Sequence, residues 1–317
     1  MSVNQKHNNV AFLYPGQGSQ HVGMGLYLYD GYPEAREKFK QVDNLLGFSL
    51  SSLCFEGPEE KLNQDLNAQL ATYAVSCITT DILKSKGVFP DVTSGYSSGF
   101  YGAAYAAGCF DFARGLEIVR RAGEILLDEG QKTNGSMAVI FGLPIEKVEN
   151  ICQRAGDVWT AIRNTPRQTL ISGTTTSVEK ALEIALDEKA LDAYSISVAT
   201  AYHSRLVKGS EERLLQDVKD EHLSDPQVPL VSYLSLNFVS DKTALKNIMA
   251  AQLSRPVLWV DLVRKLGNRN RLMIEVGPAA VISRTVIWID RRIEIISTAK
   301  ERGLKKAVKR YRALKSQ

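Results

Sequence analysis

The sequence of 317 residues predicts an α/β protein in which a small domain interrupts a larger one. First, the apolar run Val10–Tyr14 stops at a Gly-rich segment, residues 15–20, which predicts a buried strand followed by a loop. Second, the segment Gly95–Gly99 lies between a β-branched run and an Ala-rich helical pattern closed by Gly108. Third, residues 135–198 show a strand and helix order of their own.

We assign residues 1–132 and 199–317 to the larger domain. The apolar spacing there predicts three helices and two further strands before a final basic helix. The helices are expected over residues 32–46, 69–84 and 112–129, and the strands near residues 231–236 and 272–276.

Residues 133–198 form the predicted small domain. Its strands are expected at residues 136–141, 158–163, 168–172 and 194–198, and its helices at residues 145–154 and 177–186. Thr176 or Ser177 opens the second helix. The resulting order, βαββαβ, is typical of the ferredoxin-like fold.

The composition is that of an ordinary globular protein, with 44% apolar and 23% charged residues. The net charge of +4 is too small to favour nucleic acid as a partner. No apolar stretch reaches membrane-spanning length and the polar start is not a signal peptide, so we expect a cytoplasmic protein without a membrane partner. Residues 300–315 hold eight Lys or Arg, which indicates either a solvated helix face or a docking surface for an acidic partner.

The four cysteines are scattered through the chain and lack the spacing of metal ligands. We therefore expect buried, reduced thiols and no metal site.

The segment Gly95–Gly99 is a Gly-x-Ser-x-Gly pattern with Ser97 at its centre. Placed between a strand and a helix, this pattern is typical of a nucleophile elbow, in which flanking glycines permit a sharp turn and expose the serine hydroxyl. The N–H of Ser98 would then lie at the positive end of a helix. The pattern predicts an acyl-enzyme on Ser97, with an ordinary strand–helix turn as the alternative.

A serine hydroxyl needs a neighbouring base, and the chain has only four histidines. His7 and His222 lie in polar or charged stretches typical of the surface, and His21 follows the Gly-rich loop. His203 comes just after the small domain, where a cleft between domains is expected. His203 is therefore the candidate base, against the alternative of a structural histidine.

Several motifs in one order make the chain resemble the malonyl-CoA:acyl carrier protein transacylase family, which also supplies the acyltransferase domains of polyketide and fatty acid synthases. The resemblance runs from about residue 10 to about residue 286. It rests on the elbow at Ser97 and on five further segments: Pro15–Gln20, Asn164–Gln168 ahead of Ile171–Gly173, Tyr202–Ser204, Gln252–Trp259 and Glu275–Pro278.

The resemblance implies an α/β-hydrolase-like larger domain and a ping-pong reaction on thioesters. Ser97 is the implied nucleophile and His203 the implied base. A backbone carbonyl, at the position of Gln252, replaces the acidic residue that usually orients such a histidine. The N–H groups of Gln17 and Ser98 are the implied oxyanion hole.

The implied substrates carry phosphopantetheine, as coenzyme A or an acyl carrier protein, and no cofactor is bound. Asn164 matches a polar residue that lines the cleft from the small domain, and Tyr202 is a further expected substrate contact.

The chain departs from the family at the substrate pocket. Malonyl-loading members carry an arginine that binds the free carboxylate, and the matching position here is Ala122. Arg120 and Arg121 are adjacent, but one residue turns a side chain by about 100° around a helix. Tyr96 and Phe100 replace the usual His and Glu of the elbow, and both are expected substrate contacts. We therefore expect a neutral acyl group, with malonyl binding through a reoriented Arg121 as the alternative.

The favoured hypothesis is an acyltransferase that moves a non-malonyl acyl group between thioesters. A hydrolase that clears acyl groups from carrier proteins in a polyketide pathway fits the missing arginine equally well. A non-catalytic carrier-binding protein is a third hypothesis, which the intact Ser97 and His203 disfavour. A malonate-decarboxylase-type transacylase subunit is a fourth, which the missing arginine disfavours.

Overall fold

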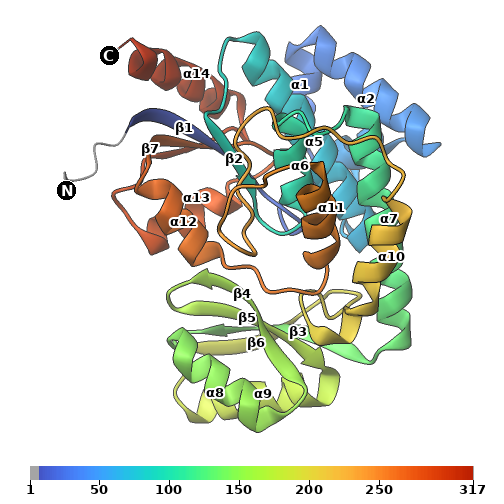
Figure 1. Ribbon diagram of the computed structural model, residues 1–317, viewed down its shortest axis with the longest axis vertical. Helices are drawn as coiled ribbons and strands as arrows, with labels where there is room; N and C mark the ends of the chain where they lie inside the picture. The colour runs from blue at the N-terminus through green and yellow to red at the C-terminus, as the bar shows by residue number, and fades with distance from the viewer. Residues whose placement is uncertain (1–6, 317) are drawn as a thin grey trace.

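Two separate β-sheets organise the chain in the computed structural model, which describes residues 7–316 (Figure 1). The larger unit is built on a parallel sheet with the strand order β2-β1-β7-β8. Its strands are β1 (His7–Tyr14), β2 (Val92–Gly95), β7 (Asn270–Glu275) and β8 (Ile295–Ser297). Residues 10–14 of β1 are fully buried, as expected for a strand in a parallel sheet covered on both faces.

Helices surround this sheet, and α5 (Asp65–Ser85) is buried on nearly all sides. A helix that is buried all round belongs to the centre of a large unit, and α5 packs against α6 and α7 there. The helices before the small unit, besides α5, are α1 (Leu26–Gly31), α2 (Pro33–Leu46), α3 (Leu50–Glu56), α4 (Glu59–Leu62), α6 (Gly99–Ala106) and α7 (Phe112–Lys132). Those after it are a short 3₁₀ turn (Arg205–Val207), α10 (Gly209–Asp217), α11 (Lys242–Ala251), α12 (Trp259–Gly267), α13 (Val281–Ile289) and α14 (Glu301–Lys315).

The small unit is an antiparallel sheet with two helices on one face. Its elements are β3 (Gly135–Phe141), α8 (Ile145–Ala155), β4 (Val158–Thr165), β5 (Gln168–Thr174), α9 (Thr175–Asp187) and β6 (Asp192–Ile196). The strand order β4-β5-β3-β6 and the βαββαβ sequence confirm the predicted ferredoxin-like fold.

Side-chain alternation in this sheet creates two different apolar faces. Ala138 and Ile140 of β3 and Ile171 of β5 pack with the helices α8 and α9 in a core of their own. Met137 and Leu170, one residue away on the same strands, instead belong to the core of the large unit. Because successive strand residues point to opposite faces, the second face of the sheet is turned toward the large unit.

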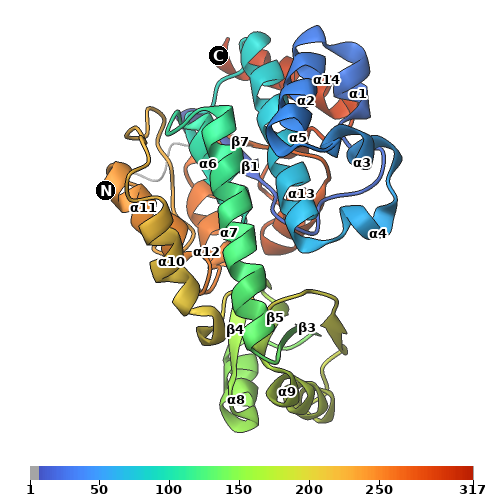
Figure 2. The ribbon, with the colours of Figure 1, turned by 90° about the vertical axis from the view of Figure 1, so that its right-hand side faces the viewer.

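Backbone hydrogen bonds attach the two units to each other. The N–H of Val257 donates to the carbonyl of Ala161 at 2.8 Å, and the N–H of Arg163 donates to the carbonyl of Val257 at 3.1 Å. Residue 257 thus extends the edge of β4 by one parallel bridge to Ile162. Figure 2 shows α7 running the length of the large unit and reaching the small one, with α10 packed along it.

Most predicted elements are confirmed within one to four residues, but the strand at residues 231–236 is wrong. Leu230 and Val231 form only isolated bridges, and the chain then turns back at Leu236, whose φ is 60°. The N–H of Ser232 donates to the carbonyl of Asn237 and closes this turn. A β-branched and aromatic run predicts a strand, but here the pairing stops after two residues because the chain turns back.

Two helix starts also differ from the prediction. Helix α5 begins at Asp65, four residues before the predicted start, and α9 is capped by Thr174, whose hydroxyl accepts from the N–H of Ser177. The division of the chain at residues 132/133 and 198/199 stays a prediction, which the separate core of the small unit supports. In residues 7–316 no helix has the length and apolar character needed to span a membrane.

The close approach of α6 to β1 gives a stability prediction. A Cβ atom at Gly99 would lie 2.1 Å from the carbonyl oxygen of Tyr14 and 2.7 Å from that of Pro15. Gly99→Ala should therefore lower the free energy of unfolding by about 1–3 kcal/mol, measured by urea denaturation. Gly31→Ala is the control, because a Cβ there meets no atom within 4 Å. Equal stabilities of the two variants would contradict this packing.

Candidate active site

Ser97 lies at a sharp turn between β2 and α6. Its φ is 52°, in the left-handed region that residues other than glycine seldom adopt. A Cβ at Gly95 would lie 2.2 Å from the backbone of Gly99, so the turn needs glycine at that position. This is the geometry of a nucleophile elbow, in which the fold over-determines a strained serine.

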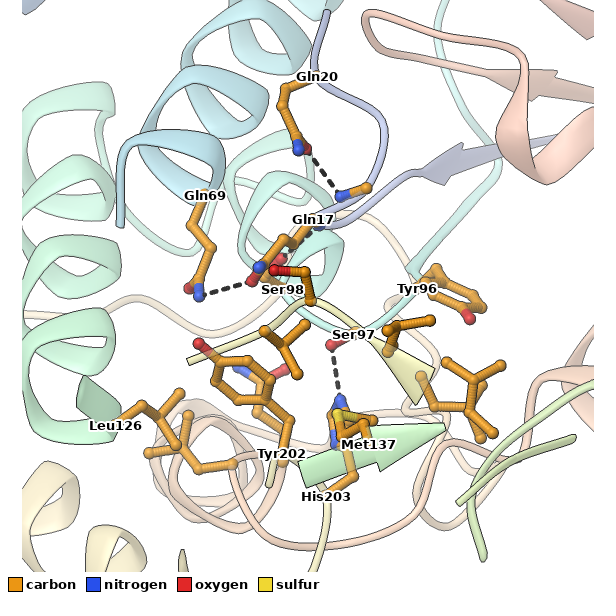
Figure 3. Close-up of a pocket in the computed structure, with 18 of the residues that line it drawn as sticks. Gln17, Gln20, Gln69, Tyr96, Ser97, Ser98, Leu126, Met137, Tyr202 and His203 are labelled. Carbon is orange, nitrogen blue, oxygen red and sulfur yellow. Dashed lines mark hydrogen bonds between the residues drawn. The ribbon is translucent and has the colours of Figure 1, made fainter. Parts of the chain in front are cut away.

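His203 lies within hydrogen-bond distance of Ser97. The Oγ of Ser97 and the Nε2 of His203 are 2.8 Å apart, although 106 residues separate them in the chain (Figure 3). His203 also has a positive φ, of 57°, and its N–H donates to the carbonyl of Leu253 at 3.2 Å. The structure thus brings together the two residues that the sequence predicts as nucleophile and base.

A backbone carbonyl orients the imidazole of His203, as expected. The main contact is the carbonyl of Arg255, whereas the resemblance implied the carbonyl of Gln252. The Nδ1 of His203 lies 3.0 Å from the carbonyl oxygen of Arg255. Because that oxygen can only accept, Nδ1 carries the proton and Nε2 is left to accept from Ser97. The Gln252 carbonyl acts second to that of Arg255 in raising the pKa of His203, and the Gln252 side chain lines the cavity.

Burial keeps the imidazole of His203 neutral. Desolvation lowers the pKa of His203 to about 4, and the two carbonyl contacts oppose this shift only in part. At neutral pH the imidazole is therefore unprotonated and able to take the proton of the serine hydroxyl.

The two predicted oxyanion donors line the same cavity as Ser97. In this structure the backbone N–H of Gln17 donates to the Oγ of Ser98 at 3.1 Å. Ser98 is the residue that precedes the first turn of α6, so its own N–H lies at the start of that helix.

A cavity of about 560 Å³ opens in front of Ser97, a size typical of ligand pockets. One part of its wall is apolar and comes mainly from the inward face of the small unit, with Met137, Ile162, Leu170 and Ile196 on the four strands. Val198, Leu126 and Leu253 complete this apolar wall. The polar part consists of Gln17, Gly18, Gln20, Asn63, Gln69, Tyr96, Ser98, Tyr101, Ser197, Tyr202 and Gln252. None of the described residues that line the cavity is Lys or Arg.

The predicted substrate contacts divide into two groups. Tyr96 and Tyr202 line the cavity, whereas Phe100, Ala122 and Asn164 do not. Phe100 is fully buried and packs edge-on against the ring of Tyr233, with ring centroids 6.1 Å apart.

Ala122 is 1% exposed in the core behind the cavity wall, one helical turn from the lining residue Leu126. Asn164 is on β4, where its Nδ2 donates to the Oε1 of Gln168.

The two arginines beside Ala122 point away from the cavity. Arg120 binds Glu117 and Glu124, with its closest N–O distances at 2.6 Å. Arg121 binds Glu117 at 2.8 Å and Glu221 at 3.0 Å. These ion pairs hold both guanidinium groups on the outer side of α7, which disfavours a reoriented Arg121 as the partner of a substrate carboxylate.

Among the side chains that the structure describes, the other histidines and the cysteines do not line the cavity. His21 and His222 are exposed, and neither lines the cavity. The side chain of His7 lies outside the described residues. All four thiols are free and buried, and burial raises the pKa of Cys54, Cys109 and Cys152 to about 12. Such thiols stay protonated and are poor nucleophiles.

Sequence reasoning missed two groups of residues at this site. The first is Asp65, a buried carboxylate that accepts from the pocket-lining residues Gln17 and Tyr202, and no pattern around it signals that role. The second is the apolar wall from the small unit. The sequence signal for this wall is that alternate residues along each strand face opposite sides of the sheet. That signal identifies the wall only once both faces of the sheet are known to be covered.

Comparisons with known proteins agree on one family. A family model described as an acyl transferase domain matches residues 11–310. The chain is 34% identical to a malonyl CoA-acyl carrier protein transacylase of Bacillus subtilis, over 95% of this chain and 96% of that protein. It is 31% identical to a polyketide biosynthesis malonyl CoA-acyl carrier protein transacylase of Bacillus velezensis, over 90% and 98%.

Solved structures give the same result. The malonyl CoA-acyl carrier protein transacylase of Coxiella burnetii superimposes with a TM-score of 0.92 at 30% identity, covering 98% of this chain and 99% of that one. A malonyl-transacylase in complex with a type II polyketide synthase acyl-carrier protein also superimposes with a TM-score of 0.92, at 27% identity over 95% and 99%.

The pKa of His203 gives a prediction for the pH dependence of acylation. The rate at which a neutral acyl thioester labels Ser97 should be constant above about pH 5 and fall as His203 is protonated near pH 4. Intact-mass measurement of the acyl-enzyme at millisecond to second times gives this rate. An inflection near pH 6.5, the ordinary histidine pKa, would contradict a desolvated base. His203→Asn should slow labelling at least about a hundredfold above about pH 5, and the difference should narrow below pH 4, where the wild-type imidazole is itself protonated.

The same shift affects stability. The folded pKa of His203 is below its unfolded value, so the unfolded chain binds the proton first as the pH falls. The stability linked to neutral His203 is therefore complete above about pH 6.5 and is lost progressively toward pH 4.

Proposed function

This chain belongs to the acyl transferase domain family, and on that premise we propose that it moves a neutral acyl group between thioesters through an acyl-Ser97 intermediate. The observation that carries the proposal is the hydrogen bond between Ser97 and His203, placed in a cavity whose described lining residues include no Lys or Arg.

The first half-reaction acylates the serine. The Oγ of Ser97 attacks the thioester carbonyl while its proton passes to the Nε2 of His203. The C–S bond then breaks, the thiol leaves with the proton from His203, and the acyl group stays on Ser97 as an ester. The carbonyl of Arg255 accepts from Nδ1 throughout, which orients the ring and stabilises the transient imidazolium.

The second half-reaction reverses these steps with another thiol. That thiol gives its proton to His203, attacks the ester carbonyl and takes the acyl group, and Ser97 regains its proton. In each tetrahedral intermediate the N–H groups of Gln17 and Ser98 would donate to the oxyanion. Each donor would stabilise it by on the order of 3 kcal/mol. The Ser98 hydroxyl, which now accepts from Gln17, has to turn aside for that purpose.

We propose phosphopantetheine thioesters, of coenzyme A or an acyl carrier protein, as the substrates. The support is the family membership and the relatives named above, one of which is solved with its carrier protein. The basic helix α14 contributes no residue to the described cavity wall. Its cations Lys305, Arg310 and Lys315 pair with Glu301, Glu294 and Asp91, which favours a solvated face over a docking surface.

The cavity favours a neutral acyl group. A malonyl carboxylate would lose water on entering and find no cationic partner there, at a cost of several kcal/mol. The seven aliphatic or methionine side chains of the apolar wall offer a surface to a carbon chain. Each methylene buried against them adds about 0.8 kcal/mol to binding.

A two-carrier assay tests the reaction type. The protein is incubated with one acylated carrier and a second unloaded carrier, and the masses of all species are followed. We expect the acyl mass on the second carrier, and we expect Ser97→Ala to abolish that transfer. Free acid released from the first carrier, without transfer, would instead establish the hydrolase. If Ser97→Ala still transferred the acyl group or still released free acid, an acyl-Ser97 intermediate would be excluded.

The substitution Ala122→Arg tests the substrate preference. A guanidinium one turn from Leu126 can reach a carboxylate in the cavity, and a charge-assisted hydrogen bond contributes about 1.5–3 kcal/mol. Malonyl loading relative to acetyl loading should therefore rise about tenfold or more, measured by intact mass. Ala122→Met, similar in length but uncharged, is the matched control. Wild-type protein that already loads malonyl fastest would contradict the preference.

A further inference from the structure

Asp65 is a buried carboxylate immediately behind the wall of the active-site cavity. It is the first residue of α5 and is 8% exposed. Its two oxygens accept hydrogen bonds from the Nε2 of Gln17 at 2.8 Å, the backbone N–H of Ala199 at 2.9 Å and the hydroxyl of Tyr202 at 2.5 Å. Within residues 7–316, no Lys or Arg forms an ion pair with it.

The three donors belong to three different segments that build the cavity. Gln17 is on the Gly-rich loop after β1, Ala199 follows the lining residue Val198 where the chain leaves the small unit, and Tyr202 precedes His203. Gln69, one turn along α5, donates to the Oε1 of Gln17 at 3.1 Å (Figure 3). Asp65 and Gln69 together fix the orientation of the Gln17 amide, with its NH₂ toward Asp65 and its oxygen toward Gln69.

The hydrogen-bond pattern is that of an ionised carboxylate. All three contacts donate to Asp65, and an ionised carboxylate is an acceptor only. Burial, and secondarily the Asp65 charge, raises the pKa of Tyr202, so its phenol keeps the proton that it donates. A negative charge thus lies one hydrogen bond behind two lining residues, Gln17 and Tyr202.

We propose that Asp65 is a specificity-determining residue that makes this wall of the cavity anionic and so excludes acyl groups bearing a carboxylate. The inference rests on the proposed acyl-Ser97 intermediate. It gives a second reason, besides the missing cation, why a carboxylate-bearing acyl group would be excluded. The Asp65 carboxylate and a carboxylate on the acyl group would repel each other most strongly where water is excluded. None of the described lining residues is a Lys or Arg that could screen this repulsion. Asp65 also positions Gln17 and Tyr202, the neighbours of the oxyanion site and of His203.

The test compares two acyl groups of the same shape. Malonyl-coenzyme A and its carboxamide isostere are close in shape but only malonyl carries the negative charge, and the rate at which each loads Ser97 is measured by intact mass. Asp65→Asn should raise the malonyl-to-isostere loading ratio at least fivefold. Asp81→Asn, which removes another carboxylate of α5 that binds Lys38 and Tyr105, is the control and should change the ratio less than twofold.

Tyr202→Phe separates charge from loss of structure. It removes one donor and leaves the Asp65 charge less neutralised, so the ratio should fall at least twofold, opposite to Asp65→Asn. A merely structural role would move both variants in the same direction. If Asp65→Asn does not fold, the fall in Tyr202→Phe decides alone, and an unchanged or higher ratio there overturns the proposal.

The outcomes distinguish this inference from the proposed function. If the wild-type protein loaded neither thioester, both the acyl-Ser97 proposal and the proposed role of Asp65 would be contradicted. Loading of the isostere by wild type, with an unchanged ratio in Asp65→Asn, would overturn the role of Asp65 and leave the acyl-Ser97 proposal standing.

Discussion

The hydrogen bond between Ser97 and His203 is the interaction on which the rest of the site depends, because its two ends come from different parts of the fold. Ser97 is held by the strained turn between β2 and α6, and His203 by the segment that leaves the small unit. Residues 253–257 connect His203 to the small unit: Leu253 and Arg255 bind His203, and Val257 pairs with β4. The small unit thus helps to position His203 as well as covering the cavity, so the proposed catalytic geometry includes it.

Electrostatics at this site follow from exclusion of water. Desolvation keeps His203 neutral, and a backbone carbonyl replaces the carboxylate that a more solvated histidine would use. The same desolvation makes any unpaired substrate charge costly. The proposed preference for a neutral acyl group rests on Ala122, on the outward ion pairs of Arg120 and Arg121, and on the buried carboxylate of Asp65.

The fold and the juxtaposition of Ser97 with His203 could be predicted from the sequence because the motifs that indicate them are local. The turn in Gly-x-Ser-x-Gly requires glycine for steric reasons, so the motif is recognisable in the sequence itself. The βαββαβ order follows from the periodicity of apolar side chains. The strand expected at residues 231–236 failed because pairing is a tertiary property. Phe100, Ala122 and Asn164 lie outside the described cavity wall, and their roles stay predictions. Which side chain faces a cavity, and which carbonyl faces an imidazole, depends on packing between distant segments, so the contact of His203 with the Arg255 carbonyl could not be read from the sequence. Asp65 gave no signal, since its donors are remote in sequence.

The proposed function requires Ser97 to receive a neutral acyl group in preference to an anionic one. The most direct measurement is a competition on the wild-type protein, with malonyl- and butyryl-coenzyme A at equal concentrations and the acyl-enzyme quenched within the first turnover. Intact mass then gives the share of each acyl group, and peptide mapping places it on Ser97. We expect the butyryl-enzyme to exceed the malonyl-enzyme at least tenfold, whereas a predominance of malonyl on Ser97 would overturn the proposed preference.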